Sequence, residues 1–466
     1  MPHAPMAEAP GAVSRNPATG EVIERFAFQT PAEIEQALAD ADAAFRVWRA
    51  TPIAERAEVY VRLAATLRAR AAEIAPVITR EMGKILRESH AEVEKCAATA
   101  EWYAEHGPAL LADEPVEVEG GDEVHVAYLP IGPILGIMPW NLPLWQAIRA
   151  SVPIMLSGNA FVLKHAPNVM RCAHLLRDAW EDSGLPRGLF AILNADNDAV
   201  SAAIEDRRIA GVTLTGSMKA GSAVAALAGR ALKKSVLELG GIDPFIVLAD
   251  ADLDAAVAAG IRARFANAGQ VCLAAKRFIL EAPIAEAFTA RFLDAARAIR
   301  AGDPTDEATT IGPIAREDLR DGVHEQVTRS ISQGARLLLG GHKVEGAGWF
   351  YAPTVLSDVR PDMAAFDEEV FGPVAALVVA RDADHALELA NTSEYGLSGN
   401  LWTADADKAR DMARRMETGG VFVNGFTASN PRTPVGGVKK SGYGRELSHF
   451  GIREFTNAQT VWTKGG

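Results

Sequence analysis

The feature that most constrains the fold is an alternation of short apolar segments and longer amphipathic segments from about residue 133 to about residue 440. Stretches such as 211–215 are predicted to be strands, and the segments between them, such as 217–231, are predicted to be helices. Strands that alternate with helices form parallel sheets with helices on both faces. The sequence therefore predicts an α/β protein built from doubly wound sheets.

The length of the chain predicts more than one domain. A single hydrophobic core stops growing beyond roughly 250–300 residues, and this chain has 466. Gly240-Gly241 interrupts the alternation, and we place a domain boundary there. The predicted first domain comprises residues 1–115, which are helical over 31–107, and residues 129–240. The predicted second domain comprises residues 241–444.

Two segments fit neither alternating series. Residues 116–127 alternate apolar and polar side chains around Gly120-Gly121, which predicts an exposed hairpin, and residues 454–463 read as a terminal strand. Exposed strand edges need covering. We therefore expect segments 116–128 and 445–466 to pair with another subunit, in a homodimer or a homotetramer.

Composition excludes several classes of protein. The hydrophobic content of 48% and charged content of 23% are typical of a soluble protein, and a net charge of −13 argues against a general nucleic-acid binder. We find no apolar run long enough to cross a membrane and no signal peptide in residues 1–13. Three widely separated cysteines fit the cytosol, and no local spacing predicts a metal site.

Cys272 is the first candidate for chemistry. It ends the turn-rich stretch Asn267-Ala-Gly-Gln-Val-Cys272, which follows a predicted helix. A lone cysteine is most often a small buried hydrophobe, but Gly269 and Gln270 suit an exposed loop better than a core. A loop thiol with a lowered pKa is a candidate nucleophile.

Two polar residues stand at predicted strand ends, where ligands collect in open α/β sheets. Glu238 follows Leu237, and a partly buried glutamate can act as a general base near neutral pH. The alternative is a surface carboxylate. Asn141 lies between Pro139 and Pro143, and a rigidly held amide can donate to an oxyanion. The alternative for Asn141 is a structural turn.

The stretch Thr215-Gly-Ser-Met-Lys-Ala-Gly221 follows a strand and opens a helix. Its glycines permit a phosphate to approach the helix N-terminus. The stretch lacks the Gly-x-Gly-x-x-Gly spacing, so alone it is a weak indication of a dinucleotide site. Lys164 ends another strand and could hold a ribose, or could be an ordinary solvated lysine.

Taken together and in this order, these motifs resemble the aldehyde dehydrogenase superfamily over nearly the whole chain. The 34 residues from Glu238 to Cys272 fit the family spacing, as do Glu368-Glu-Val-Phe-Gly-Pro373 and Gly436-Gly-Val-Lys-Lys-Ser-Gly-Tyr-Gly-Arg-Glu446. The resemblance implies two α/β domains, the first binding NAD or NADP and the second catalytic, with a small β arm for oligomerisation. It implies that an aldehyde is oxidised through a thiohemiacetal and a thioester on the cysteine.

The resemblance also implies roles for individual residues. Cys272 would be the nucleophile, Asn141 the oxyanion donor and Glu238 the base that activates water. The implied cofactor-binding residues are Trp140, Lys164, Gly216, Ser217, Gly221, Glu369 and Phe371.

Within the superfamily the chain looks most similar to bacterial succinate-semialdehyde dehydrogenases, with three departures. Val435 replaces a phenylalanine that lines the substrate tunnel, Ala266 replaces a carboxylate-binding arginine, and Ala274 replaces a second cysteine. A longer or bulkier aldehyde is therefore an alternative substrate. A catalytically silent member of the fold is a more distant alternative, since Cys272, Glu238 and Asn141 are all intact.

The expectation about the substrate rests on Arg149. It matches a carboxylate-binding arginine of these enzymes, in a mostly apolar helix with no neighbouring acid to pair with it. The alternative is a surface arginine. Ser429 matches a second substrate contact, and Arg432 is a weaker candidate. We expect Arg149→Ala to impair oxidation of succinate semialdehyde but not of butanal.

The cofactor expectation rests on Pro167. It occupies a position where NAD-selective relatives often carry a glutamate that repels a 2′-phosphate, and a proline can neither repel nor bind one. Lys164 and His165 could tolerate the extra charge. Both NAD and NADP are expected to serve, with NAD somewhat favoured.

Overall fold

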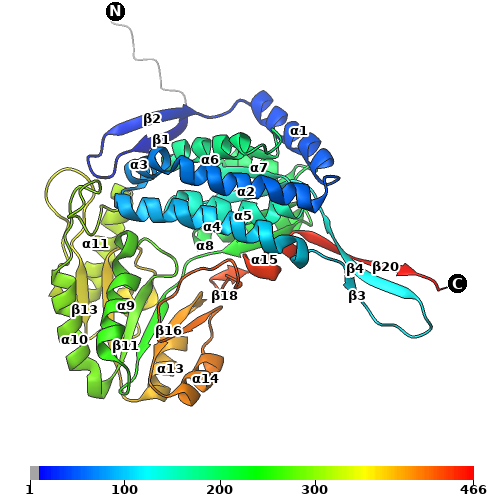
Figure 1. The fold of residues 1–466 in the computed structure, drawn as a ribbon. Helices are drawn as coiled ribbons and strands as arrows, with labels where there is room; N and C mark the ends of the chain where they lie inside the picture. The colour runs from blue at the N-terminus through cyan, green and yellow to red at the C-terminus, as the bar shows by residue number, and fades with distance from the viewer. Residues whose placement is uncertain (1–9, 466) are drawn as a thin grey trace, which may run out of the picture.

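The computed structural model describes residues 10–465 and has two α/β bodies and a projecting β arm (Figure 1). Residues 1–9, in which part of the signal-peptide expectation lies, and residue 466 are outside the described residues. The predicted α/β class, with two doubly wound domains, is confirmed. Within residues 10–465, no helix has the length and apolar character that a membrane crossing requires.

The first body is built on a mostly parallel sheet. In the described residues its strand order is β19-β9-β8-β5-β6-β7, and only the β19–β9 pair is antiparallel. The strands are β5 (Ile134–Met138), β6 (Phe161–His165), β7 (Phe190–Ile192), β8 (Gly211–Thr215), β9 (Lys234–Glu238) and β19 (Gly442–Tyr443). Its helices are α1 (Pro31–Trp48), α2 (Ile53–Ala69), α3 (Ala71–Met82), α4 (Leu86–Leu110), α5 (Pro143–Leu156), α6 (Met170–Asp182), α7 (Asn197–Glu205) and α8 (Met218–Arg230).

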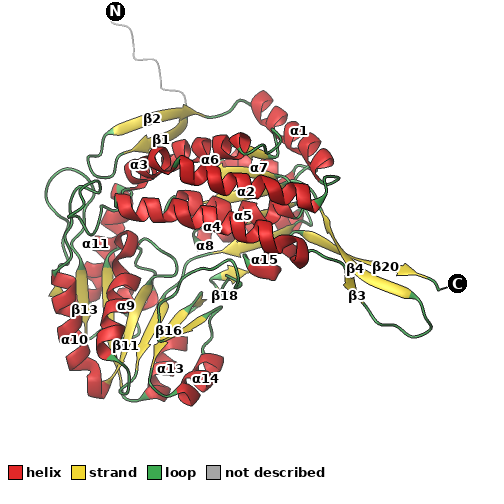
Figure 2. Cartoon of the chain, in the orientation of Figure 1, coloured by secondary structure: helices red, strands yellow, loops and turns green. Residues whose placement is uncertain are grey.

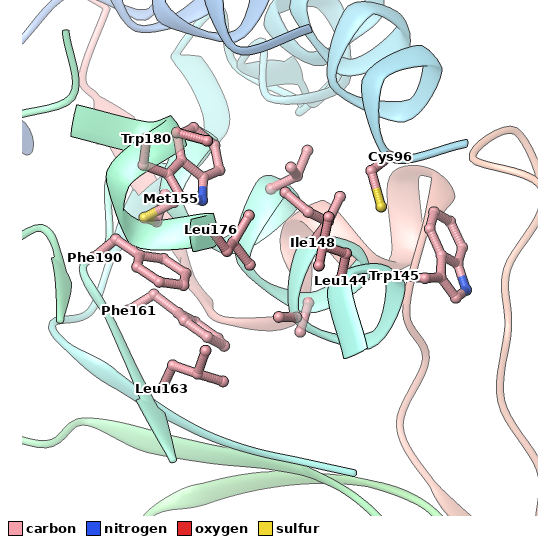
Figure 3. Close-up of a cluster of buried hydrophobic side chains, with 14 of the residues drawn as sticks. Cys96, Leu144, Trp145, Ile148, Met155, Phe161, Leu163, Leu176, Trp180 and Phe190 are labelled. Atoms are coloured by element: carbon pink, nitrogen blue, oxygen red, sulfur yellow. The ribbon is translucent and has the colours of Figure 1, made fainter. Parts of the chain in front are cut away.

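The core of this body lies between the sheet and the helices that cover it. Trp180 packs near Phe190, which stacks on Phe161 with ring centroids 5.8 Å apart (Figure 3). Helix α5 is buried along its whole length, including Trp145 and Arg149. An almost wholly apolar sequence explains this burial, and Arg149 is the exception that needs a partner.

The second body holds the other large sheet. In the described residues its order is β12-β13-β14-β11-β10-β16-β17, with only β12–β13 antiparallel. The strands are β10 (Asp243–Val247), β11 (Ala275–Glu281), β12 (Arg336–Leu339), β13 (Thr354–Ser357), β14 (Val374–Ala380), β16 (Gly399–Trp402) and β17 (Val421–Val423). Its helices are α9 (Leu253–Phe265), α10 (Ala282–Arg297), α11 (Glu317–Ser332), α12 (Ala364–Asp367), α13 (Ala383–Asn391) and α14 (Ala406–Arg415).

Gly240-Gly241 links β9 of the first sheet to β10 of the second, so the chain passes between the two sheets at the glycine pair. One detail differs from the sequence-based division: β19 lies within residues 241–444 but joins the first sheet. The smaller elements are β1 (Gly11–Arg15), β2 (Val22–Ala27), β15 (Tyr395–Gly396), β18 (Val438–Lys439), two 3-10 turns at Pro167–Val169 and Ala266–Gly269, and α15 (Ser448–Glu454).

The arm combines the two segments that fit neither alternating series (Figures 1 and 2). It contains β3 (Glu114–Pro115), β4 (Glu123–Pro130) and β20 (Thr456–Thr463), in the order β20-β4-β3. Strand β20 pairs antiparallel with β4 along its whole length, from Thr456 opposite Pro130 to Thr463 opposite Glu123. The idea that the two segments lack a partner in their own chain is therefore wrong, because each is the other's partner.

The close packing of β5 on Phe161 gives a prediction about stability. A Cβ added at Gly136 would lie 2.0 Å from the Phe161 Cζ atom, whereas one added at Gly229 on α8 meets nothing within 4 Å. Gly136→Ala should lower the free energy of unfolding by about 1–3 kcal/mol, as overpacking does. The control Gly229→Ala should be neutral or stabilise by up to about 1 kcal/mol, because alanine is the better helix former.

Urea unfolding monitored by circular dichroism checks both variants. A Gly136→Ala variant as stable as the wild type would show that Phe161 is not held against this strand.

Candidate active site

A cavity of about 240 Å³ lies where the first sheet meets the second body. It brings together many of the predicted site residues, from segments far apart in the sequence. The predicted residues that line it are Trp140, Asn141, Gly216, Ser217, Cys272, Glu369 and Phe371. Pro139, Gln146, Thr215, Leu239, Gly240 and Leu319 complete the lining. Nucleophile, amide donor and cofactor candidates therefore share one space.

The segment before Cys272 has an unusual backbone. Asn267, Ala268 and Gly269 have φ angles of 52°, 53° and 73°, all in the left-handed region. Asparagine and glycine tolerate this region, whereas an alanine there is strained. A Cβ on Gly269 would lie 2.2 Å from the carbonyl oxygen of Gly372, so the close approach also requires glycine.

Buried Arg264 holds this strained segment in place. Its Nη2 donates to the carbonyl oxygens of Gly269 (2.7 Å) and Gly372 (2.8 Å), and its Nη1 donates to that of Ala275 (3.1 Å). Hydrogen bonds from a charged donor are stronger than those between neutral groups. The segment that presents Cys272 is thus fixed by its own helix α9.

Asn141 is tied to the same segment from the other body. Its Nδ2 donates to the carbonyl oxygen of Gln270 (2.9 Å), and the Nδ2 of Asn267 donates to the carbonyl oxygen of Asn141 (2.8 Å). An amide NH₂ group carries two hydrogens. One hydrogen of Asn141 is used in this contact, which leaves the second for an acceptor in the cavity.

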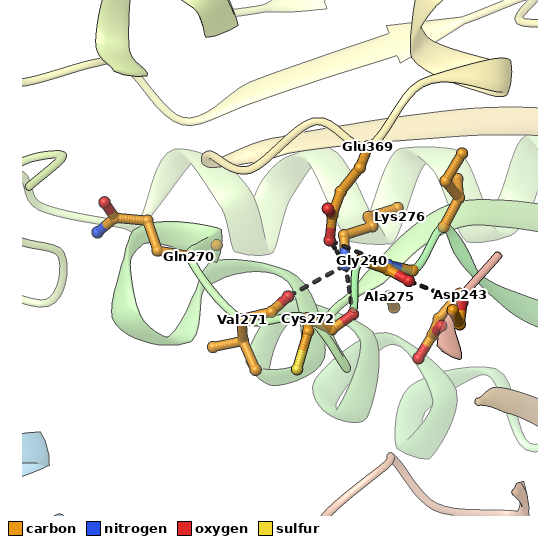
Figure 4. Close-up of polar contacts among 12 residues, drawn as sticks. Gly240, Asp243, Gln270, Val271, Cys272, Ala275, Lys276 and Glu369 are labelled. Atoms are coloured by element: carbon orange, nitrogen blue, oxygen red, sulfur yellow. Dashed lines mark hydrogen bonds and ion pairs between the residues drawn. The ribbon is translucent and has the colours of Figure 1, made fainter. Parts of the chain in front are cut away.

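Lys276 contacts the cysteine segment from β11 and was not predicted from the sequence (Figure 4). Its Nζ donates to the carbonyl oxygens of Val271 (3.0 Å) and Cys272 (2.5 Å) and forms an ion pair with Glu369 Oε1 (3.4 Å). Glu369 Oε1 also accepts from the Gly241 N–H (3.1 Å). One ammonium group therefore links the nucleophile segment to a predicted cofactor-binding residue.

Opposing influences set the pKa of the Cys272 thiol. Burial is the largest and raises the pKa to about 11, while the positive charges of Arg149 and Lys276 act to lower it. In the absence of a ligand the thiol is therefore protonated near neutral pH. It needs a proton acceptor before it can act as a nucleophile.

Glu238 ends β9 and is 2% exposed. Its Oε1 has no hydrogen-bond partner among the described residues. Burial raises its pKa to about 8, although the positive charge of Arg149 acts in the opposite direction. A carboxyl group with such a pKa can exchange a proton near physiological pH.

Arg149 is paired, contrary to the sequence-based expectation. Its guanidinium forms an ion pair with Glu446, and its Nη2 donates to Thr215 Oγ1 (3.2 Å). The expectation that no acid neutralises Arg149 is wrong, because Glu446 follows β19, which folds onto β9. Sequence neighbours alone could not reveal a partner that distant.

The remaining cofactor candidates differ in position. The Ser217 hydroxyl caps α8, accepting from the Ala220 N–H (3.3 Å). Position 221 requires a glycine because α8 packs on Leu239. A Cβ added at Gly221 would lie 2.6 Å from the Leu239 Cδ2 atom. Lys164 lies in β6, and burial lowers its pKa.

The expectation that His165 could face an extra phosphate charge is wrong. The side chain is buried, and its ring nitrogens lie 3.2 Å from Met138 O and 2.9 Å from Pro143 O. Burial lowers its pKa to about 4, so the ring is neutral near pH 7. Both nitrogens are used inside the protein.

The predicted substrate contacts lie outside this cavity. Ser429 Oγ accepts from Lys95 Nζ (2.7 Å), a contact that the sequence did not indicate. Arg432 is exposed. Val435 is buried and its backbone pairs with that of Glu446 through two hydrogen bonds of 2.8 Å.

The donors and acceptors around the cavity fit a dinucleotide. The N-terminus of α8 at Gly216 and Ser217 offers backbone N–H groups suited to a pyrophosphate. Glu369 offers a carboxylate for ribose hydroxyls. Trp140 and Phe371 meet edge to face at 5.8 Å and form an aromatic wall for a flat ring.

Comparisons with known proteins agree with this geometry. Residues 7–461 match the aldehyde dehydrogenase family. The succinate semialdehyde dehydrogenase [NAD(P)+] Sad of Escherichia coli is 58% identical, over 97% of each chain. A succinate-semialdehyde dehydrogenase [NADP(+)] of Mycolicibacterium paratuberculosis is 47% identical, over 96% of this chain and 95% of the relative. The structure of succinic semialdehyde dehydrogenase from Streptococcus pyogenes with NADP+ superposes with a TM-score of 0.95 at 34% identity, covering 97% of this chain and 100% of that one. On the strength of this match over nearly its whole length, the chain belongs to the aldehyde dehydrogenase family.

Proposed function

We propose that this aldehyde dehydrogenase oxidises succinate semialdehyde, or a similar aldehyde that ends in a carboxylate, to the dicarboxylate. The observation that carries the chemistry is the meeting of Cys272 and the Asn141 amide in one cavity. The substrate is supported by the names of the similar relatives, among them the Escherichia coli enzyme at 58% identity.

In the proposed reaction the Cys272 thiol loses its proton, and the sulfur attacks the aldehyde carbon to give a thiohemiacetal. The oxygen of the aldehyde becomes negative in this step. The second hydrogen of Asn141 Nδ2 can donate to it, since the first is held by Gln270 O. The Cys272 sulfur would thus bond to the reacting carbon while the Asn141 amide binds its oxygen.

Oxidation leaves the acyl group on Cys272 as a thioester, and water then cleaves it. Glu238 accepts a proton from the attacking water and returns it to the departing sulfur, so the carbon–sulfur bond breaks, the carboxylic acid is released and the thiol is restored. The absence of a hydrogen-bond partner for Glu238 Oε1 among the described residues suits this role. Splitting one difficult step into two is the benefit of covalent catalysis.

NAD or NADP, when bound, would supply the hydride acceptor. The residues proposed to hold it are Trp140, Lys164, Gly216, Ser217, Glu369 and Phe371, with Gly221 acting through the packing of α8. The relatives named for NAD(P)+ and NADP(+) support use of both cofactors. Pro167 offers no charge against a 2′-phosphate, and we propose only a slight preference for NAD.

The pairing of Arg149 with Glu446 revises its proposed role. Its guanidinium acts to lower the pKa of both Cys272 and Glu238, so we propose that it favours their charged forms during the reaction. Ser429 remains the proposed hydroxyl contact for the substrate.

We further propose that the chain works in the cytosol as a homodimer or a dimer of dimers. The arm projects from the body, and β20 is an edge strand of its sheet. Trp462 on that strand is 54% exposed. An exposed aromatic side chain on a free strand edge is typical of a surface that pairs with another subunit.

The first prediction concerns the substrate. Wild-type enzyme should oxidise succinate semialdehyde with a kcat/KM at least about tenfold above that for butanal, a difference of about 1.4 kcal/mol.

With either aldehyde, the kcat/KM values measured with NAD and with NADP should agree within about a hundredfold. Cys272→Ala should abolish turnover without unfolding the chain. NAD(P)H formation measures all of these rates. An alanine variant within about tenfold of the wild type would remove Cys272 as nucleophile.

The second prediction concerns Glu238. Only the deprotonated form accepts a proton, and its pKa is raised to about 8, so thioester hydrolysis should speed up as pH rises through about 8. Glu238→Gln should keep a rapid burst of NADH, followed by a slow phase with no inflection near that pH. Rapid mixing between pH 6 and pH 9 measures both phases. If burst and steady rate fall equally, Glu238 is not chiefly the base for hydrolysis.

The third prediction concerns assembly. Light scattering at micromolar concentration should give the mass of a dimer or a tetramer, and Trp462→Asp should shift the mass toward a single chain because a charge would enter the interface. The control is Val47→Asp, which adds the same charge at an exposed position on α1, outside the arm, and should leave the mass unchanged. A wild-type mass equal to one chain would refute the proposal.

A further inference from the structure

A second cavity, of about 590 Å³, lies beside the cysteine segment. Val271, Leu273 and Ala274 line it, whereas Cys272 lines the first cavity, so the segment forms part of the wall between the two. The remaining lining comes from α4, α5, α9 and residues 426–427, together with Lys84, Leu142, Ala266 and Asn267. An aldehyde could therefore approach the nucleophile from a side that the cofactor candidates do not occupy.

Most charged groups of this cavity already have partners. Lys84 forms a buried ion pair with Glu92. The other oxygen of Glu92 accepts from the backbone N–H groups of Leu144 and Trp145, both at 2.9 Å. The Glu88 carboxylate accepts from the Asn267 N–H at 3.2 Å.

Two arginines of the cavity are also engaged. Arg87 Nη1 donates to Thr309 O (3.3 Å). Arg262 is exposed, and its guanidinium lies over the ring of Phe426, 4.8 Å from the centroid. Ala266 contributes only a methyl group to the lining.

Lys95 differs from Arg87 and Arg262 in burial, because those two arginines are exposed whereas Lys95 is half-buried. Its Nζ donates to Ser429 Oγ (2.7 Å) and lies 4.1 Å from the centroid of the Trp145 ring. Among residues 10–465 no carboxylate forms an ion pair with it. Burial lowers its pKa to about 8, and the nearby charge of Arg149 acts in the same direction. A partly buried cation without a counter-ion favours the binding of an anion.

The contact with Ser429 adds a second donor. Because the Ser429 oxygen accepts from Lys95, its own hydrogen is free to point elsewhere. The ammonium group also retains two hydrogens. Lys95, which lines the cavity from α4, and Ser429, which contacts Lys95 from another segment of the chain, therefore place two donors side by side.

The position fits the far end of a short substrate. Lys95 lines the same cavity as Val271 and Leu273, the sequence neighbours of Cys272, and the charge of Arg149 acts on the pKa of both Lys95 and Cys272. Arg149 itself is neutralised by Glu446 and is only 1% exposed. Within residues 10–465, Arg149 has a carboxylate partner and Lys95 has none.

We propose that Lys95, together with Ser429, binds the carboxylate of the aldehyde and so determines specificity for a carboxylated substrate. The inference deepens the proposed function and rests on it. It names a residue on α4 that acts on binding, while Cys272, Asn141 and Glu238 perform the chemistry.

The test replaces Lys95 by methionine, which has a similar length and no charge. Lys95→Met should lower kcat/KM for succinate semialdehyde by about thirtyfold or more, mainly through KM, since losing one partner of a buried charge pair has effects of this size. The kcat/KM for butanal should change by less than about threefold, because butanal has no carboxylate to lose. Lys95→Arg should recover much of the lost activity.

Arg262→Ala is the matched control, because Arg262 is a cation of the same cavity that is exposed and stacked on Phe426. It should leave both aldehydes within about threefold of wild type. If Lys95→Met impairs both aldehydes equally, the lysine is structural. If it impairs neither, the carboxylate is bound elsewhere. Either result overturns the proposal.

A second measurement separates this inference from the proposed substrate. Inhibition of butanal oxidation by 4-hydroxybutyrate, the alcohol analogue of succinate semialdehyde, reports carboxylate binding whichever aldehyde is preferred. Its inhibition constant should rise at least about tenfold in Lys95→Met. Wild-type enzyme that shows no preference for succinate semialdehyde refutes the proposed function, whereas an unchanged inhibition constant refutes the role of Lys95.

Discussion

The site depends on a reciprocal pair of amide contacts between the two bodies. Asn141 donates to Gln270 O, and Asn267 donates to Asn141 O. These bonds hold the end of β5 against the segment that carries Cys272. A nucleophile and an oxyanion donor on separate sheets keep their relative position only if such contacts are rigid, because small displacements at a reacting centre reduce rates strongly.

The site depends, second, on how the buried charged side chains are distributed around it. Arg149, Glu446 and Glu238 lie together behind the cavity, and Lys276 and Glu369 lie on the side of the cysteine segment. Buried charges persist when each has a partner. Glu238 differs from the others because, among the described residues, it forms no ion pair and its Oε1 has no hydrogen-bond partner, and burial raises its pKa. The carboxyl group proposed to exchange a proton is thus one that the described residues leave without an ion-pair partner.

We propose that the two cavities bind different ligands. The first is lined by the cysteine, the aromatic pair and the N-terminus of α8, which suit a cofactor. The second is lined by Lys95 and the backbone neighbours of Cys272, which suit an acidic aldehyde. Residues 271–274 form part of the wall between them, and they directly follow the strained segment that Arg264 holds through Gly269 O. One stretch of backbone therefore lies between the proposed cofactor and substrate cavities and carries the thiol that is proposed to attack the aldehyde.

The sequence by itself determined the α/β class, the alternation of strands and helices and the residues that gather at the first cavity, because periodicity and local motifs are properties of neighbouring residues. Strand 211–215 and helix 218–230 lie within a residue of their predicted bounds for this reason. Tertiary structure alone decided the partners of charged and edge groups. Glu446 reaches Arg149, and β20 reaches β4, across most of the chain. The unpaired state of Lys95 is likewise a property of the folded cavity, since an ion pair depends on distance in space and not on separation in sequence.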